Sequence, residues 1–259
     1  TLVYTLSLHD ALPISVIEVV TEGVLLRMLR EDPSLESVGL LIFDEIHERS
    51  LEADLGLALV LHARETFGAE MPLKLLAMSA TLDADALAAL LAAPVLRSEG
   101  RLHPVEIRYG RAQTPRERIT ERVTTTAEEA LRRHGDSSVL AFLPGQAEIR
   151  RVADSVNVPP NVTVHPLYGD LDLARQRQAI AASPPGQRKL VLATNIAETS
   201  LTIDGVDVVI DSGLARAPAF DPGTGMSRLH TVRISRAASE QRAGRAGRLR
   251  PGVCYRLWS

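Results

Sequence analysis

The feature that most constrains the fold is an alternation of short apolar runs with helical patterns from Val16 onward. In the first half of the chain, strands are predicted at 16–20, 39–43 and 73–78, where "VIEVV", "GLLIF" and "LKLLAM" stand. The run at 39–43 is too uniformly apolar to face water. Strands that alternate with helices are typical of parallel sheets joined by crossover helices. The chain is therefore predicted to be an α/β protein.

Two helical segments of this half carry apolar residues at helical spacing, which predicts the sides that cover the sheet. In segment 22–32 these residues are Val24, Leu25, Met28 and Leu29. In segment 51–65 they are Leu51, Leu55, Leu59 and His62. We expect both sides to be buried.

A polar stretch with proline interrupts the alternation at 109–118 and predicts a linker between two domains. The first domain would cover 16–108 and the second 119–259. A second alternating series follows the linker, with strands predicted at 138–143, 162–168, 189–194 and 206–211. Near its end, two arms of alternating polar and apolar residues flank "DPGTG", which predicts an antiparallel hairpin over 214–235.

The first fifteen residues stand apart from this pattern. "TLSLHDALPIS" resembles what a DNA-sequencing adapter encodes in one frame, so we interpret residues 1–15 as a non-native leader and leave them out of the fold prediction. The alternative is an ordinary native strand or turn. If the leader is not native, a true N-terminal part of the protein is missing.

Composition excludes several classes of protein. No apolar run is long enough to span a bilayer, and no signal peptide is visible, so we expect a cytoplasmic protein without membrane contact. The single cysteine, Cys254, excludes an internal disulfide and a multi-cysteine metal site. A net charge of −3 argues against a surface that coats nucleic acid non-specifically, although a local basic cleft remains compatible with it.

Two carboxylates, Asp44 and Glu45, follow the buried strand 39–43 directly. The carboxyl end of a parallel strand lies where ligands bind in open α/β sheets. Adjacent carboxylates repel and favour a bound cation, and Mg²⁺ on nucleotide phosphates is the obvious candidate. The second carboxylate would activate water. A solvated acidic loop is the alternative, and a zinc-protease motif is excluded because Leu51 stands where the second histidine would be.

The segment "QRAGRAGR" at 241–248 repeats arginine at a spacing of three. On a helix, Arg245 and Arg248 would share a face and converge on a phosphate. Gly244 and Gly247 predict close backbone approach to a neighbour. An arginine-rich solvated helix is the alternative. Small hydroxyl and amide side chains also follow two predicted strands, in "MSAT" at 78–81 and "LATNIAETSLTIDGV" at 192–206. These are weaker signals, because simple capped turns would explain both.

In this order, six segments resemble the motif series of DEAH-box RNA helicases, most closely its bacterial HrpB-type branch: "TEG" (21–23), "DEIH" (44–47), "SAT" (79–81), "FLPG" (142–145), "TNIAETSLTIDG" (194–205) and "QRAGRAGR" (241–248). The resemblance covers residues 16–259. It implies two RecA-like domains with parallel sheets flanked by helices, the first incomplete, and a β-hairpin inserted in the second. It also implies ATP or another NTP with Mg²⁺ between the domains, and single-stranded RNA across both. We expect a monomer.

The resemblance assigns roles by position. The catalytic set would be Asp44 on Mg²⁺, Glu45 on the attacking water, and His47, Gln241, Arg245 and Arg248. Ser79 and Thr81 would couple nucleotide state to domain closure. Thr202 and Asp204 would lie near the nucleotide sugar. The RNA backbone would contact Thr21, Gly23, Thr194 and Asn195. The hairpin would separate strands.

Three departures from the family qualify these roles. Ile46 replaces the alanine of the box and should face the apolar interior. Ile180 stands where the family often stacks an aromatic ring on the base, so base selectivity should be loose. No "GxxxxGK[ST]" loop occurs in the sequence, so we expect a fragment that neither binds ATP tightly nor hydrolyses it. Two other functions stay open: a non-catalytic nucleic-acid-binding scaffold, and the same motor acting on DNA.

Overall fold

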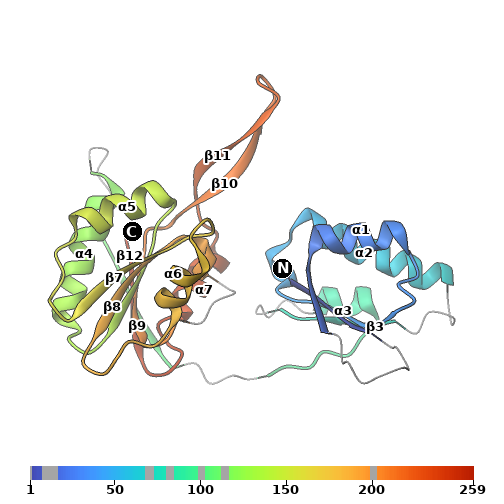
Figure 1. Ribbon diagram of the computed structural model, residues 1–259, viewed down its shortest axis with the longest axis horizontal. Coiled ribbons are helices and arrows are strands. Elements are labelled where there is room, and N and C mark those ends of the chain that lie inside the picture. The colour runs from blue at the N-terminus through green and yellow to red at the C-terminus, as the bar shows by residue number, and fades with distance from the viewer. Residues whose placement is uncertain are drawn as a thin grey trace. The chain divides into compact units, whose positions relative to one another are not determined.

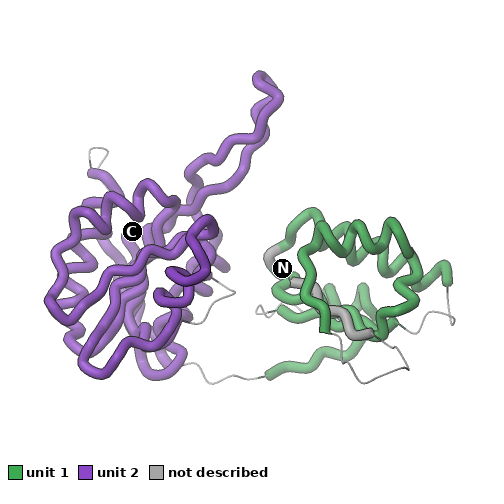
Figure 2. The backbone as a smooth tube through the Cα atoms, in the orientation of Figure 1, with its two compact units in different colours: residues 1–98 green, residues 99–259 purple. Residues whose placement is uncertain are grey.

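The structure is a computed structural model that describes residues 2–7, 17–67, 73–79, 85–98, 103–111, 117–198 and 203–259. Contacts divide the chain into two compact units, Thr1–Ser98 and Glu99–Ser259 (Figures 1 and 2). Both units combine a sheet with helices, which confirms the α/β prediction. Within the described ranges, no helix is both long and apolar enough to cross a bilayer.

Unit 1 is built on a four-stranded sheet in the order β2-β1-β3-β4. Its strands are β1 (Leu2–Ser7), β2 (Ile17–Thr21), β3 (Val38–Phe43) and β4 (Lys74–Ala77). β3 and β4 pair in parallel, as expected, whereas β1 is antiparallel to both β2 and β3. The strand that we weighed as the alternative for the leader is therefore present at Leu2–Ser7. Its non-native origin stays a prediction.

Helices α1 (Glu22–Glu31), α2 (Leu51–Phe67) and α3 (Asp85–Leu91) complete unit 1. The prediction for α1 is confirmed, because Leu25 and Leu29 are buried. The prediction for α2 is wrong, because the residues predicted to be buried are exposed. Its buried side consists of Ala53, Gly56, Leu57, Val60 and Ala63. The physical reason is close packing through small residues: a Cβ at Gly56 would lie 3.2 Å from Leu25 Cδ2.

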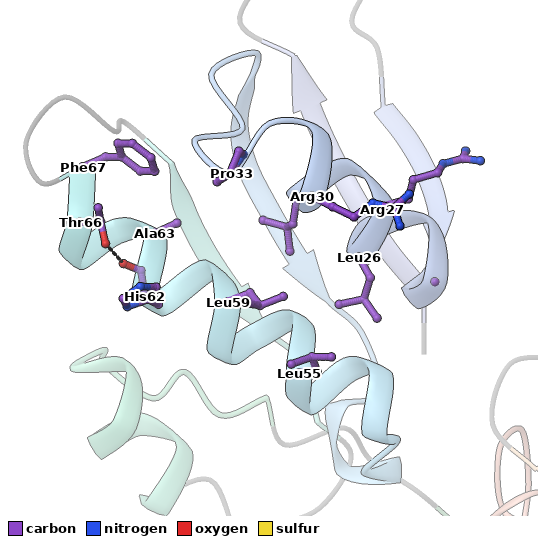
Figure 3. Close-up of a pocket in the computed structure, with 12 residues that line it drawn as sticks. Leu26, Arg27, Arg30, Pro33, Leu55, Leu59, His62, Ala63, Thr66 and Phe67 are labelled. Atoms are coloured by element: carbon purple, nitrogen blue, oxygen red, sulfur yellow. Dashed lines mark hydrogen bonds between the residues drawn. The ribbon is translucent and has the colours of Figure 1, made fainter.

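Because the side of α2 that was predicted to be buried is exposed, an apolar groove lies between α1 and α2 (Figure 3). Leu26 of α1 and Leu55, Leu59 and His62 of α2 line this groove, whose volume is about 670 Å³. Leu55 is 46% exposed and Leu59 is 40% exposed. The groove therefore adds to the exposed apolar surface of unit 1.

Unit 2 is built on six parallel strands in the order β5-β12-β9-β6-β8-β7. They are β5 (Val105–Tyr109), β6 (Ser138–Phe142), β7 (Val162–Leu167), β8 (Arg188–Ala193), β9 (Val206–Asp211) and β12 (Gly252–Arg256). The predicted boundary needs one correction. The sequence places most of β5 in the first domain, but β5 pairs with β12, so it is a strand of unit 2. Part of the predicted linker, 112–116, lies outside the described residues.

Helices cover both faces of this sheet (Figure 1). On one face, α4 (Ile119–Arg133) and α5 (Gln146–Ser155) pack Leu131 and Ile149 against β-strand residues such as Val139. On the other face, α6 (Leu173–Ile180) and α7 (Arg236–Gly244) pack Ala179 and Ala243. All five residues of β6 are buried, as expected of a central parallel strand.

The predicted hairpin is confirmed as β10 (Leu214–Asp221) and β11 (Met226–Arg233), which project from the body of unit 2 (Figure 1). Asp221 fixes the turn because its carboxylate accepts the N–H of Gly223 at 2.9 Å and the hydroxyl of Thr224 at 2.9 Å. Gly225 has a φ of 67°, which explains glycine at the end of "DPGTG".

Two histidines of unit 2 predict a loss of stability in mild acid. Burial lowers the pKa of His134 and of His165 below the ordinary value of 6.5, and neighbouring cations lower both further. The unfolded chain therefore binds more protons below about pH 6.5. We expect the free energy of unfolding to fall between pH 7 and pH 5, measured by urea unfolding with Trp258 fluorescence. The variant His134→Gln/His165→Gln should show a flatter pH profile, and an unchanged profile would contradict the assignment.

Candidate functional site

The two predicted catalytic carboxylates follow β3 directly. Asp44 is half-buried, and its Oδ1 accepts the N–H of Glu45 at 2.9 Å. His47 lies beside Glu45: its Nε2 is 3.4 Å from Glu45 Oε2, and its side chain is only 9% exposed. The structure thus brings Asp44, Glu45 and His47 together in one loop at the carboxyl end of a strand.

The loop is fastened to β4 through Ile46. The N–H of Ile46 donates to the carbonyl of Met78 at 3.1 Å, and the N–H of Met78 donates to the carbonyl of Phe43 at 2.8 Å. Ile46 is buried in the core of unit 1, which confirms its predicted orientation. Ser79, the predicted coupling residue, follows Met78 and is exposed. The loop and Ser79 therefore lie at neighbouring strand ends, whereas Thr81 lies outside the described residues.

The backbone of the loop is strained. Glu45 and Arg49 have φ values of 50° and 55°, in the left-handed region that residues other than glycine rarely adopt. Such conformations cost about 1–3 kcal/mol each and persist only where the surroundings impose them. Here Arg49 is held by Asp54, with an Nη2–Oδ2 distance of 2.8 Å. Strain of this kind concentrates at functional sites.

The donor set of this loop fits Mg²⁺. Asp44 and Glu45 offer carboxylate oxygens, which are the hard ligands that Mg²⁺ takes. In the part of the chain that the structure describes, no three His, Cys, Asp or Glu side chains gather as a metal cage. Mg²⁺ keeps several waters and binds phosphates, so it needs only one or two protein carboxylates. Zinc would need three or four protein ligands.

The predicted nucleic-acid contacts of unit 1 lie on open surface. Thr21 ends β2, precedes α1 and is exposed. Gly23 is also exposed, and a Cβ there would meet no atom within 4 Å. The first turn of α1 is therefore accessible to a phosphate backbone, which helix N-termini attract.

The corresponding residues of unit 2, Thr194 and Asn195, lie at the carboxyl end of β8. Thr194 follows β8, and its N–H donates to the carbonyl of Leu167 at 3.1 Å. Asn195 is exposed in the short turn that begins there. Asp204 is exposed, and its N–H donates to the carbonyl of Ile180 at 3.3 Å, which ties the two positions predicted to face the nucleotide. Thr202 lies outside the described residues.

The predicted pairing of Arg245 with Arg248 on one helix face is wrong. Helix α7 ends at Gly244, with Arg245 as its C-cap, so Arg248 lies beyond the helix. Arg245 is buried and its guanidinium donates to the carbonyl of Glu198 at 2.9 Å, whereas Arg248 is exposed. Gln241 is half-buried on α7.

The glycine prediction for this segment is confirmed at one of its two positions. A Cβ at Gly247 would lie 2.5 Å from the carbonyl oxygen of His103, so this glycine permits close approach of two backbones. A Cβ at Gly244 would meet nothing within 4 Å.

Sequence reasoning missed the residue that holds this region together. Arg242 is fully buried and donates to Asp211 at 2.8 Å, to Glu198 at 3.1 Å and to the carbonyl of Leu214 at 3.2 Å. Its guanidinium also lies 4.8 Å from the ring centre of Phe142. Burial raises the pKa of Asp211, and Arg242 opposes that rise. The sequence signal that could have predicted such a partner is Asp211 at the end of an apolar strand, since a buried carboxylate requires a cation.

Comparisons with known proteins establish the family of this chain. The model of the helicase conserved C-terminal domain family matches residues 121–250, half of the chain. The chain belongs to this helicase family. The match lies within unit 2 and includes Thr194, Asn195, Gln241, Arg245 and Arg248.

Relatives and solved structures extend the helicase similarity over both units. The chain is 52% identical over 93% of its length to ATP-dependent RNA helicase HrpB of Escherichia coli, and 35% identical over 94% to ATP-dependent RNA helicase DHX33 of mouse. A crystal structure of the E. coli DEAH/RHA helicase HrpB superimposes with a TM-score of 0.85 at 51% identity, over 92% of this chain. The chain spans 30% of HrpB and 36% of DHX33.

Proposed function

We propose that this chain is the part of an ATP-dependent RNA helicase that carries the hydrolytic carboxylates and the phosphate-facing arginines. The observation that carries the proposal is the strained loop at the end of β3, where Asp44, Glu45 and His47 are held together. A solvated acidic loop would not explain two left-handed residues and a buried Ile46. The similarity to proteins named as ATP-dependent RNA helicases supports the same conclusion.

Unit 1 would supply the groups that act on water and the metal. Asp44 would hold Mg²⁺, which neutralises phosphate charge when it is bound. Glu45 would accept a proton from the attacking water, and His47, beside Glu45, would restrict the orientation of that carboxylate. Ser79, at the neighbouring strand end, would respond to the position of this loop.

Unit 2 would supply the groups that bind phosphate and sugar. Arg248 is exposed at the surface of unit 2, so we assign it as the principal arginine finger. Arg245 would act from its bond to Glu198. Gln241 would orient the water or the terminal phosphate, and Asp204, with Thr202, would contact the sugar.

The nucleic acid would be held by its backbone. Thr21, Gly23, Thr194 and Asn195 present small hydroxyl, amide and backbone groups, which contact phosphates and sugars without reading sequence. The projecting hairpin β10–β11 would separate strands ahead of this path. Because these groups do not select a base, we expect little sequence preference.

The test is phosphate release by the full-length protein with and without single-stranded RNA. We expect ATP turnover that RNA stimulates more than DNA does, and no turnover by the 259-residue chain alone. Equal stimulation by DNA would favour the motor acting on DNA. RNA binding without any turnover would favour the non-catalytic scaffold. Turnover by the 259-residue chain would contradict the expectation that a chain without a phosphate loop does not hydrolyse ATP.

Base selectivity provides a separate prediction. Ile180 is half-buried, with its carbonyl held by Asp204 and by Lys189, and an aliphatic side chain cannot stack on a base as a ring does. We expect ATP, GTP, CTP and UTP to be hydrolysed at comparable rates. A preference of about tenfold for ATP would contradict this expectation, because it would require a base contact that Ile180 cannot make by stacking.

A further inference from the structure

A short hydrogen bond joins the two functional segments of unit 1. The hydroxyl of Ser50 donates to Glu22 Oε1 across 2.6 Å, a distance typical of a hydroxyl on an ionised carboxylate. Glu22 lies between Thr21 and Gly23, the proposed nucleic-acid contacts. Ser50 ends the loop that begins at Asp44. The two partners are 28 positions apart, so the fold and not local sequence brings them together.

Ser50 is fixed on the helix that follows it. Its Oγ accepts the N–H of Ala53 at 3.0 Å, and its carbonyl accepts the N–H of Asp54 at 3.0 Å. These are the contacts of a helix N-cap. Because Oγ accepts from α2 while its proton is donated to Glu22, one hydroxyl connects the starts of α2 and α1. The two helices lie side by side (Figure 1).

Glu22 is placed to sense a ligand at the start of α1. It is the first residue of that helix and is half-buried, whereas both of its neighbours are exposed. A phosphate that binds the N–H groups of this first turn would shift the turn, together with the Glu22 carboxylate. The 2.6 Å bond would carry that shift to Ser50.

The loop between Asp44 and Ser50 is suited to change its position when Ser50 shifts. Its left-handed residues, Glu45 and Arg49, hold their conformation only because surrounding contacts impose it. The bond of Arg49 with Asp54 joins the loop only to α2. The Ser50–Glu22 bond joins the loop to Glu22, which lies between the proposed nucleic-acid contacts Thr21 and Gly23.

We propose that Glu22 and Ser50 are positioning residues that make hydrolysis responsive to bound nucleic acid. The inference rests on the proposed function, since it needs nucleotide hydrolysis at Glu45 and nucleic acid at Thr21 and Gly23. Neither Glu22 nor Ser50 contacts the reacting atoms. Their role is to set the position of the carboxylate loop when the first turn of α1 is occupied.

The test compares basal and RNA-stimulated ATP hydrolysis by full-length variants. Ser50→Ala should keep the basal rate and the RNA concentration at half-stimulation within about twofold. Its maximal stimulated rate should fall about tenfold. Ser50→Thr, which keeps the hydroxyl, should restore stimulation. Glu22→Ala leaves the cap of α2 intact and should reproduce the Ser50→Ala loss, and the double variant should lose no more than either single variant.

Ser34→Ala is the matched control, because Ser34 makes a similar bond to Asp32, at 2.5 Å, away from the loop. It should change neither rate. Equal losses of basal and stimulated rates in Ser50→Ala and Glu22→Ala would show a general structural role and overturn the proposal, as would normal stimulation in both. A wild-type protein that RNA does not stimulate would overturn the proposed function itself, and the inference with it.

Discussion

Replacing Glu45 with glutamine should lower RNA-stimulated ATP hydrolysis by about 10²–10⁴-fold in the full-length protein. Glutamine has the shape of glutamate but cannot accept a proton from water, so the loop should fold normally while the attacking water stays unactivated. RNA affinity should be unchanged, because Glu45 does not belong to the nucleic-acid segment. Phosphate release at saturating ATP and RNA measures the rate, and fluorescence anisotropy of labelled RNA measures the affinity.

Glu52→Gln is the control for this prediction. Glu52 is exposed in the first turn of α2, so the same change of charge there should leave hydrolysis unaffected. Wild-type turnover by Glu45→Gln would show that another residue activates the water.

Replacing Arg242 with methionine should lower the free energy of unfolding of unit 2 by about 3–5 kcal/mol, because it leaves Asp211 buried without its cation. Part of that cost should be relieved at low pH, since protonation neutralises Asp211, whose pKa burial already raises. Trp258 is the only tryptophan and belongs to unit 2, so urea unfolding followed by its fluorescence reports on this unit.

Arg236→Met is the matched control on the same helix. Arg236 is 93% exposed and pairs with Glu240 at 3.0 Å in solvent, so its removal should leave the unfolding midpoint unchanged. Equal effects of the two substitutions would contradict the assignment of Arg242 as the residue that holds α7 to the sheet.

Strands such as β3, β6, β8 and β9 could be predicted because buried parallel strands appear in the sequence as apolar runs, whereas β5 and β12 were not predicted. The α2 helix shows where that approach fails. Leu55 and Leu59 are exposed, while the core-facing side combines Leu57 and Val60 with the small residues Ala53, Gly56 and Ala63. Hydrophobic periodicity weights large residues, whereas close helix packing selects small ones. The strand β5 was assigned to the wrong domain because pairing with β12, about 150 residues away, leaves no local signal.

The candidate site shows a similar division. Asp44, Glu45 and Ile46 could be placed from sequence because a strand and a motif fix their positions, and the structure places them as expected. The backbone turn that ends α7 at Gly244 could not be foreseen, so the shared face of Arg245 and Arg248 was wrong. Neither the Glu22–Ser50 bond nor the Arg242 cluster has a signal within one segment, since each joins residues that only the fold brings together.

The most direct measurement of the central claim is a double-mutant cycle between Glu45 of unit 1 and Arg248 of unit 2, scored as single-turnover ATP hydrolysis by the full-length protein. If both side chains act on one phosphoryl transfer, each single substitution, Glu45→Gln or Arg248→Ala, removes most of the rate. The double variant is then about as slow as the slower single variant. Losses that multiply would show two independent effects and contradict the account.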